Sequence, residues 1–246
     1  MPTEYIYLET VESTNVYASK QVSKTNPQHP KVYFTTNQSG GTGQFGRKWY
    51  SGKDKNLSLS IVYPWKKMTA AQNINILMTV SLAIQNALMV LTGLNSTIKW
   101  PNDIYYDDKK LGGVLIQNVL KGSKVNYSII GIGINVNTKR FPRWVPNPIS
   151  VSQIENKDYE LDNFARLLSS AIIQYLDIRE SLKFKTIKTN YLKNLYKYKK
   201  ELKYKNKKGV IKWGTLHDVN DNAHLVIKDS DGELHSFDHG ELSMIV

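Results

Sequence analysis

The segment IKWPNDIYYDDKKLGGVLIQNV, residues 98–119, contains the clearest indication of the fold in this chain of 246 residues. Its adjacent tyrosines and its final apolar run are typical of β-strands, and the DDKK between them is typical of a turn. A second turn, LKGSK, leads into VNYSIIGIGINVN, residues 125–137, which predicts another strand. Adjacent strands joined by tight turns predict an antiparallel or mixed sheet.

The residues before and after this segment predict further strands and flanking helices. VYFTT and NLSLSIVYP have strand-like patterns. Apolar residues recur at helical spacing over residues 69–91, and Gly93 is well placed to end that helix. ELDNFARLLSSAIIQYLDIRE predicts a second amphipathic helix, and a short helix is expected after the cap Ser13-Thr14-Asn15. Strands beside segregated helices indicate an α+β domain.

The C-terminal part of the chain has a different character. GVIKWGTLHDV, AHLVIKD and GELHSFDHGELSMIV predict three or more short strands separated by tight turns. These strands predict a small β-barrel. We therefore expect a main domain over residues 1–182, a lysine-rich helix or linker over residues 183–200, and the barrel over residues 201–246.

Positive charge is concentrated in one segment, although the formal net charge of the whole chain is +12. Residues 183–208 contain eleven lysines and one acidic residue, Glu201, so this segment contributes +10 and the rest of the chain +2. Its lysines are interleaved with tyrosines, which is one pattern of a stacking surface for single-stranded nucleic acid. These tyrosines are Tyr191, Tyr196, Tyr198 and Tyr204.

A solvated amphipathic helix and linker is the other interpretation of this segment. In that case its apolar residues pack inward, namely Leu192, Leu195, Tyr196 and Leu202. The segment has no arginine, the residue that base and phosphate recognition prefers, so we favour the helix and linker. We expect weak, salt-sensitive binding of polyanions and no specific binding of DNA.

The composition also bounds the compartment and the chemistry. The chain has no cysteine, which excludes disulfides and thiolate metal sites and fits a reducing compartment. Its first residues, MPTEYIYLET, do not form a signal peptide, and no stretch approaches the roughly 20 apolar residues of a membrane span. We expect a cytoplasmic protein with no membrane partner.

The glycine-rich stretch GGTGQFGRKW, residues 40–49, is a candidate binding loop. Glycines let backbone amides approach a ligand closely, and Arg47 and Lys48 follow them, so the loop is suited to wrapping a phosphate or a carboxylate. A plain turn is the alternative.

The segment KWPNDIYYDDKKLGG contains a second candidate site. Lys110 lies beside Gly112 and Gly113, and a lysine fixed next to glycines is suited to neutralising a carboxylate and a phosphate that must meet. Asn102 and Asp103 place an amide and a carboxylate side by side at a strand end. Each of these pieces alone is also typical of a turn.

Other polar clusters favour ordinary surface structure. Asp107-Asp108 could pair as catalytic carboxylates, but YYDDKK is typical of a hydrated hairpin turn. DSDG, residues 229–232, resembles the start of a calcium loop, yet the distal glutamate is out of register, which leaves a turn. His235 and His239 are spaced as surface histidines rather than as metal ligands. No metal ligand is assigned to the protein.

The four motifs Ser13-Thr14-Asn15, GTGQFGRKW, KWPNDIYYDDKKLGG and GIGINVN occur in the order and spacing of the class I biotin protein ligases. The chain closely resembles that family over almost its whole length. The family's glycine loop usually reads GRGRRGRKW, and its KWPND is followed by KLAG or KLGG. The resemblance implies a mixed or antiparallel central sheet with flanking helices and a small SH3-like C-terminal β-barrel.

The resemblance also implies an activity. Biotin and ATP, with Mg²⁺, would give biotinyl-5'-AMP and pyrophosphate, and a lysine of a biotin carboxyl carrier domain would then receive the biotinyl group. The carrier would belong to a carboxylase such as acetyl-CoA carboxylase. Many family members carry an N-terminal winged helix-turn-helix and repress transcription. Because this chain begins at the catalytic core, we expect a ligase without operator binding, as a monomer or a homodimer.

Site residues are implied by the same resemblance. The biotin side would contain Ser13, Thr14, Asn15, Gln38, Gly113 and Gly133, beside Gly112. The cover over biotin and adenylate would contain Gly41, Thr42, Gly43 and Gln44. The nucleotide side would contain Trp49 at the adenine, Asn102, and Asn135 near the phosphates or Mg²⁺. The catalytic residues would be Lys110 at the carboxylate and phosphate, Asp103 at the attacking lysine, and Arg47.

Two alternatives remain open on the sequence. One is a related acyl-protein ligase, such as one for lipoate. Three features disfavour it, which are the KWPND turn, the glycine loop and the terminal barrel. The other is a non-catalytic biotin sensor or nucleic-acid binder, which the retention of Lys110 and Asp103 disfavours.

The glycine loop yields a first prediction. Thr42 and Gln44 stand where the family usually has arginines, so two cations are missing from the cover. Charge-assisted hydrogen bonds to phosphate are roughly twice as strong as neutral ones. Gln44→Arg is therefore expected to slow release of the adenylate, measured by filter binding of the labelled intermediate. An unchanged release rate would contradict this and would mean that Arg47 and Lys48 compensate.

Overall fold

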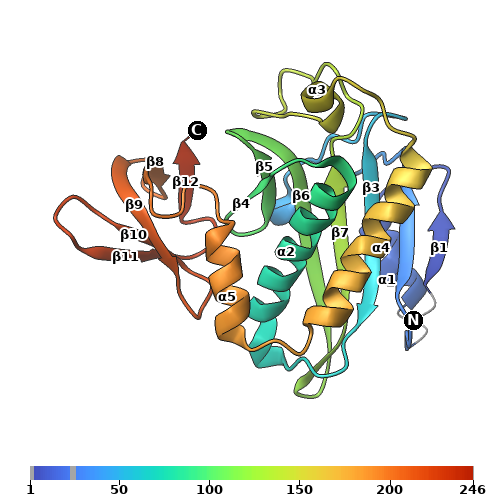
Figure 1. The fold of residues 1–246 in the computed structure, drawn as a ribbon, viewed down its shortest axis with the longest axis horizontal. Coiled ribbons are helices and arrows are strands. Elements are labelled where there is room, and N and C mark those ends of the chain that lie inside the picture. The colour runs from blue at the N-terminus through green and yellow to red at the C-terminus, as the bar shows by residue number, and fades with distance from the viewer. Residues whose placement is uncertain (1–2, 23–25, 246) are drawn as a thin grey trace.

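The computed structural model describes residues 3–22 and 26–245 and contains a seven-stranded mixed sheet, in the order β1-β2-β3-β7-β6-β5-β4 (Figure 1). β1 pairs with β2 in parallel, and every other neighbouring pair in this sheet is antiparallel. The strands are β1 Glu4–Tyr7, β2 Lys31–Thr35, β3 Leu57–Pro64, β4 Thr97–Lys99, β5 Asp103–Tyr106, β6 Lys109–Lys121 and β7 Lys124–Ile134. The predicted antiparallel or mixed sheet is confirmed.

The hairpins of this sheet differ from the predicted ones in one detail. Lys109 and Lys110 were expected in a turn, but both belong to β6, and the turn consists of Asp107 and Asp108 alone. A two-residue turn is sufficient because Asp107 adopts a left-handed conformation with φ of 49°. Lys110 is therefore held by a strand backbone rather than by a loop.

Helices cover both faces of the large sheet. The helices are α1 Thr14–Val22, α2 Asn73–Thr92, α3 Val151–Glu155, α4 Leu161–Arg179 and α5 Phe184–Lys193, with short 3₁₀ turns η1 Gln44–Gly46 and η2 Ala70–Gln72. α2 lies between α4 and α5 on one face, and α1 packs on β2, β3 and β7 from the other (Figure 1). The two long predicted helices are confirmed, and Gly93, with φ of 71°, ends α2 as expected.

One helix among the described residues is long and apolar enough to cross a membrane. It comprises Ala70–Thr92, so the expectation that no stretch approaches a membrane span is wrong on length and composition. This stretch contains no charged residue, and 67% of its most apolar 18-residue window is buried inside the protein. α2 is accordingly apolar around most of its circumference, because the sheet, α4 and α5 all pack against it.

The C-terminal residues form a second, five-stranded antiparallel sheet in the order β11-β10-β9-β8-β12. Its strands are β8 Glu201–Asn206, β9 Ile211–Val219, β10 Leu225–Lys228, β11 Leu234–Phe237 and β12 Leu242–Ile245. The sheet is curled. Two strands separate β8 from β11 in it, yet the ring centroids of Tyr204 on β8 and Phe237 on β11 lie only 5.5 Å apart. It begins at Glu201, where the sequence predicts the small β-structure to begin.

Residues 183–200 of the lysine-rich segment are a helix and linker, as favoured from the sequence, whereas Leu202 and Tyr204 belong to strand β8. Tyr191, Tyr196 and Tyr204 are buried, as are Leu195 and Leu202. The alternative of a tyrosine stacking surface is wrong for this segment, since a buried ring cannot meet a base. The apolar core runs without a break from the large sheet through α5 to the second sheet, so the division at residues 182 and 200 stays a prediction.

Hydrogen bonds to α5 and to the loop between β9 and β10 hold the KWPND turn from outside. The Tyr191 hydroxyl donates to the Pro101 carbonyl at 2.6 Å, and the Trp100 indole N–H donates to the Ala223 carbonyl at 2.9 Å. Lys188 of α5 pairs with Asp218 at 3.1 Å and with Asp221 at 3.2 Å. The turn is thereby fixed to two elements that lie far from it in sequence.

Removing the Tyr191 hydroxyl tests this attachment. Tyr191→Phe should lower the free energy of unfolding by about 1–2 kcal/mol, because the partly buried Pro101 carbonyl loses its donor. Urea denaturation measures the change. Tyr198→Phe, in the partly exposed linker, is the matched control and should change stability less. Equal effects in the two variants would contradict the assigned role of the hydrogen bond.

Candidate active site

A cleft of about 810 Å³ opens where the glycine loop, the KWPND turn, β6 and β7 meet residues of the second sheet. Most of the predicted site residues line it. The exceptions are Gly41, Gly112 and Asn135. The second sheet adds lining residues that the sequence did not suggest, which are Lys205, Asn206, Lys207 and residues 239–244.

One end of the cleft is a buried polar cluster. The Thr14 backbone amide donates to Gln38 Oε1 at 2.9 Å. Ser60 Oγ lies 2.8 Å from Thr14 Oγ1 and 2.6 Å from Asn15 Oδ1. Ser13 caps the start of α1 weakly, with the Val16 amide 3.5 Å from its Oγ. These preorganised donors and acceptors suit a small ligand with both N–H and C=O groups.

Glycines on β6 and β7 form the floor beside this cluster. A Cβ at Gly131 would lie 2.4 Å from Asn15 Oδ1, and a Cβ at Gly133 would lie 2.4 Å from the Trp49 indole. A Cβ at Gly113 would lie 3.0 Å from the same indole. All three positions need glycine for close approach rather than for a left-handed backbone. Gly131 was not predicted, although it belongs to the same GIGIN motif as Gly133.

The Trp49 side chain covers this floor. Its ring lies on Gly113 and Gly133, with Lys110 Nζ 5.7 Å from the ring centroid. Among the described residues, its buried Nε1–H has no hydrogen-bond partner. An unpaired buried donor costs about 1–3 kcal/mol, which a ligand acceptor would recover. The residues predicted for biotin and for adenine therefore meet at one point of the cleft.

Lys110 is the central cation of the cleft. Its Nζ lies 2.6 Å from Asp103 Oδ2. Its backbone is fixed on both sides, because its amide donates to the Asn147 carbonyl at 2.8 Å and its carbonyl accepts from the Ile149 amide at 3.0 Å. Asn135 Nδ2 donates to the Ile149 carbonyl at 3.0 Å. Asn135 thus supports the segment behind Lys110, and its predicted contact with phosphate or Mg²⁺ stays a prediction.

The other two residues outside the cleft also have structural contacts. A Cβ at Gly41 would lie 2.6 Å from Gln38 Nε2, and a Cβ at Gly112 would lie 2.6 Å from Ile134 Cδ1. Both glycines permit close packing next to lining residues. Direct ligand contacts by Gly41 and Gly112 stay predictions.

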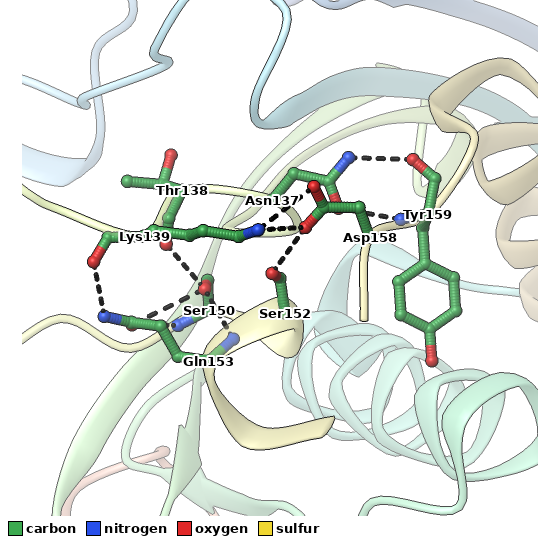
Figure 2. A network of polar contacts seen from close by, with 8 residues as sticks. All are labelled: Asn137, Thr138, Lys139, Ser150, Ser152, Gln153, Asp158 and Tyr159. Atoms are coloured by element: carbon green, nitrogen blue, oxygen red, sulfur yellow. Dashed lines mark hydrogen bonds and ion pairs between the residues drawn. The ribbon is translucent and has the colours of Figure 1, made fainter. Parts of the chain in front are cut away.

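A polar network fixes the proline-rich loop that supports Lys110 (Figure 2). The side-chain amide of Asn137 donates to the Tyr159 carbonyl at 2.7 Å and accepts from the Tyr159 amide at 2.9 Å. Asp158 accepts from Ser152 at 2.7 Å and pairs with Lys139 at 3.2 Å. Ser150 Oγ donates to the Thr138 carbonyl at 2.7 Å. The loop between these residues is consequently held at both ends.

The glycine loop reaches across the cleft to the second sheet. Its tip has left-handed backbone at Phe45, with φ of 55°, and at Gly46, with φ of 70°. The Phe45 ring packs on His239, with centroids 4.8 Å apart, and His239 also contacts the Trp100 ring at 5.5 Å. Phe45 occupies a third arginine position of the family's GRGRRGRKW pattern, so three loop cations are replaced rather than two.

His239 is a cleft residue, and its prediction as a plain surface histidine is wrong. His235 instead pairs with Asp229 at 2.6 Å, and Asp229 also accepts from the amides of Asp231 and Glu233, which makes the DSDG stretch a turn as predicted. Among the described residues, no group of three or more His, Asp or Glu side chains is placed to hold a metal ion.

The charge of the cleft is positive. Its lining contains seven lysine and arginine residues and three carboxylates. The lysines include Lys99, whose Nζ lies 3.2 Å from the Tyr105 hydroxyl and 4.6 Å from the centre of that ring. Burial lowers the pKa of Lys99 to about 8, and an anion bound nearby would raise it again. The excess of cations suits a ligand that carries phosphate or carboxylate groups.

The contact between His239 and the loop should depend on pH. Burial, and then the nearby Arg47, lower the pKa of His239 below its ordinary value. The unfolded chain therefore binds this proton more readily, and the contribution of His239 to stability falls as the pH drops below about 6.5. Relative to His239→Gln, the wild type should lose stability between pH 7.5 and pH 5, measured by thermal unfolding. A difference that does not change with pH would contradict this.

Two curated proteins illustrate what the sequence of this chain is similar to. BirA of Escherichia coli, a bifunctional ligase/repressor, is 30% identical over 140 residues, which is 57% of this chain and 43% of BirA. The biotin--[acetyl-CoA-carboxylase] ligase of Paracoccus denitrificans is 24% identical over 161 residues, 63% of this chain and 66% of that protein. The match thus spans less than half of the length of BirA.

Solved structures share the fold over the whole chain. The biotin protein ligase of Aquifex aeolicus in complex with biotin and ATP has a TM-score of 0.77 at 24% identity, and 98% of each chain is covered. The sequence model of the Biotin/lipoate A/B protein ligase family matches residues 7–135, which is more than half of the chain. The matched part includes the polar cluster, the glycine loop, Lys110 and the glycine floor. The chain belongs to the Biotin/lipoate A/B protein ligase family.

Proposed function

We propose that the chain is an ATP-dependent biotin protein ligase, which activates biotin as biotinyl-5'-AMP and transfers it to a lysine of a biotin carboxyl carrier domain. The main support is that Lys110, which lies 2.6 Å from Asp103 and next to Gly113 of the glycine floor, lines the same cleft as the buried polar cluster. The names of the relatives, BirA and a biotin--[acetyl-CoA-carboxylase] ligase, support the same activity. We also propose that the protein acts in the cytoplasm.

In the first step a biotin carboxylate oxygen attacks the α-phosphorus of ATP, and pyrophosphate leaves. The two reactants are anions, so Lys110 lowers their repulsion and stabilises the charge that develops between them. The Thr14, Asn15 and Gln38 cluster would bind the ureido ring. Mg²⁺ would travel with the phosphates, as it usually does in nucleotide sites, and would neutralise the leaving pyrophosphate.

In the second step the amine of the acceptor lysine attacks the acyl carbon, and AMP leaves with the pair of electrons of the anhydride bond. The attacking amine must be neutral. Asp103 would orient it and accept its proton, which requires that the carboxylate gives up its 2.6 Å contact with Lys110. The phosphate of the adenylate is the group that would take over Lys110.

The family also contains lipoate ligases, and the polar cluster distinguishes the two substrates. Lipoate ends in a dithiolane ring, which has no N–H or C=O group. The cleft end that contains Thr14, Asn15 and Gln38 is a network of polar groups that hydrogen-bond to one another, and a ring with N–H and C=O groups can join this network whereas an apolar ring cannot. This chemistry favours biotin.

Transfer of labelled biotin to a purified carrier domain, with ATP and Mg²⁺, tests the proposal. Lys110→Ala should reduce transfer by roughly 100-fold or more, since it removes the main stabilising cation. Lys121→Ala, at the exposed β6–β7 turn outside the cleft, is the matched control and should transfer at the wild-type rate.

The same assay separates the rival functions. Excess lipoate should leave biotin transfer unchanged, and transfer of lipoate in place of biotin would overturn the substrate assignment. Binding of biotin without any transfer by the wild type would instead indicate a biotin sensor.

A further inference from the structure

The outer face of the second sheet combines lysines with exposed apolar side chains. Lys203 lies opposite Trp213 on β9 and opposite Ile245 on β12, and Lys205 lies opposite Ile211 and Ser243. Directly opposite residues share a face of a sheet, so these six residues form one surface, which we call the outer face. Leu202, Tyr204 and Met244 alternate with them and are buried on the other side.

This outer face is unusually apolar for a solvent-facing surface. Trp213 is 57% exposed, Ile211 52% and Ile245 40%. Lys203 Nζ lies 5.8 Å from the Trp213 ring, so a cation and an aromatic anchor are adjacent. Aromatic and aliphatic groups next to cations are typical of the central part of a protein interface.

The charges of the outer face are available to a partner. Among the described residues, neither Lys203 nor Lys205 makes an ion pair within 4.0 Å. Glu201 is the nearest carboxylate along β8, and it is outnumbered by the eleven lysines of residues 183–208. The surface therefore complements an acidic partner.

The outer face is continuous with the mouth of the cleft. Lys205 and Ser243 belong to both, and Lys207 lines the mouth beside them. A macromolecule seated on Trp213 and Lys203 would thus present its nearby residues to the cleft. Only a macromolecular substrate needs such an extended surface next to the chemistry.

We propose that the outer face docks the protein acceptor, by contact of an acidic surface of the acceptor with Lys203 and Lys205 and of an apolar side chain with Trp213 and Ile211. This inference rests on the proposed ligase function and specifies how its protein substrate is recognised. A protein is favoured over a nucleic acid because two of the three exposed apolar groups are aliphatic, and the segment that carries most of the charge has no arginine.

Two activities of the full chain separate docking from chemistry. Biotin-dependent exchange of labelled pyrophosphate into ATP requires no acceptor, whereas transfer to a biotin carboxyl carrier domain requires docking. Lys203→Glu and Trp213→Ala should each raise the KM for the carrier domain by about tenfold or more, with pyrophosphate exchange unchanged. The Lys203→Glu effect should shrink at high salt, because an ionic contact is screened.

Matched controls carry the same changes elsewhere on the surface. Lys121→Glu changes an exposed lysine at the end of β6, and Val90→Ala truncates a side chain of α2 that is 71% exposed. Both controls should keep the wild-type KM. Normal exchange by every variant also establishes that each is folded.

Each outcome decides one of the two proposals. An unchanged KM in Lys203→Glu and Trp213→Ala would overturn docking on the outer face. Loss of oligonucleotide binding in these variants with an unchanged KM would assign the face to nucleic acid instead. If the wild type shows no exchange, the ligase proposal fails, and direct titration of the carrier domain against wild type and both variants still decides whether the face binds it.

Discussion

The rest of the cleft depends on one constraint, which is that side chains must lie directly on the backbone of β6 and β7 at positions where only glycine leaves room for them. β7 has no side chain at Gly131 or Gly133, and β6 has none at Gly113, so Asn15 and Trp49 can lie directly on the sheet. Adding a methyl group at Gly131 or Gly133 would place carbon within 2.4 Å of one of these residues. Asn15 of the polar cluster and Trp49 at the end of the glycine loop take their positions from this floor. The sheet is therefore both the hydrophobic scaffold and one wall of the site.

The position of Lys110 follows from rigid neighbours rather than from the loop that its sequence suggested. A strand backbone, the pairing with Asn147 and Ile149, and the Asp103 carboxylate together hold its amine. Holding a charge in place before the reaction avoids reorganisation during it, which is the main source of electrostatic catalysis. The glycine loop differs from this rigid part, since its exposed tip rests on the second sheet through the contact of Phe45 with His239.

Local patterns in the sequence were sufficient for most of the fold. Periodicity predicted the long helices and the central strands, and Gly93 marked the end of α2 correctly. The four motifs also brought most of the site residues into one cleft. Burial of Tyr196 was predicted with the inward-packing residues and is confirmed, but burial of Tyr191 could not be deduced from its interleaving with lysines, because exposed and buried tyrosines follow the same spacing in a short helix and linker.

Cleft residues that lie far along the sequence from the four motifs could not be predicted from the sequence. His239 lies nearly two hundred positions after the glycine loop, and no local pattern links it to Phe45. The same holds for Lys205 and Ser243, which line the cleft only because the second sheet lies beside it. Lys99 belongs to the KWPND motif, but the position of its side chain beside Tyr105 depends on the pairing of β4 with β5.

The contact of Phe45 with His239 links two parts of the chain thermodynamically. A ligand that orders the glycine loop also holds the second sheet against the KWPND turn, through His239 and Trp100. By reciprocity, a partner that steadies the second sheet favours the closed loop by the same free energy. Binding of the acceptor at the proposed docking face and retention of a small molecule in the cleft would thus be cooperative, even though no side chain need contact both ligands.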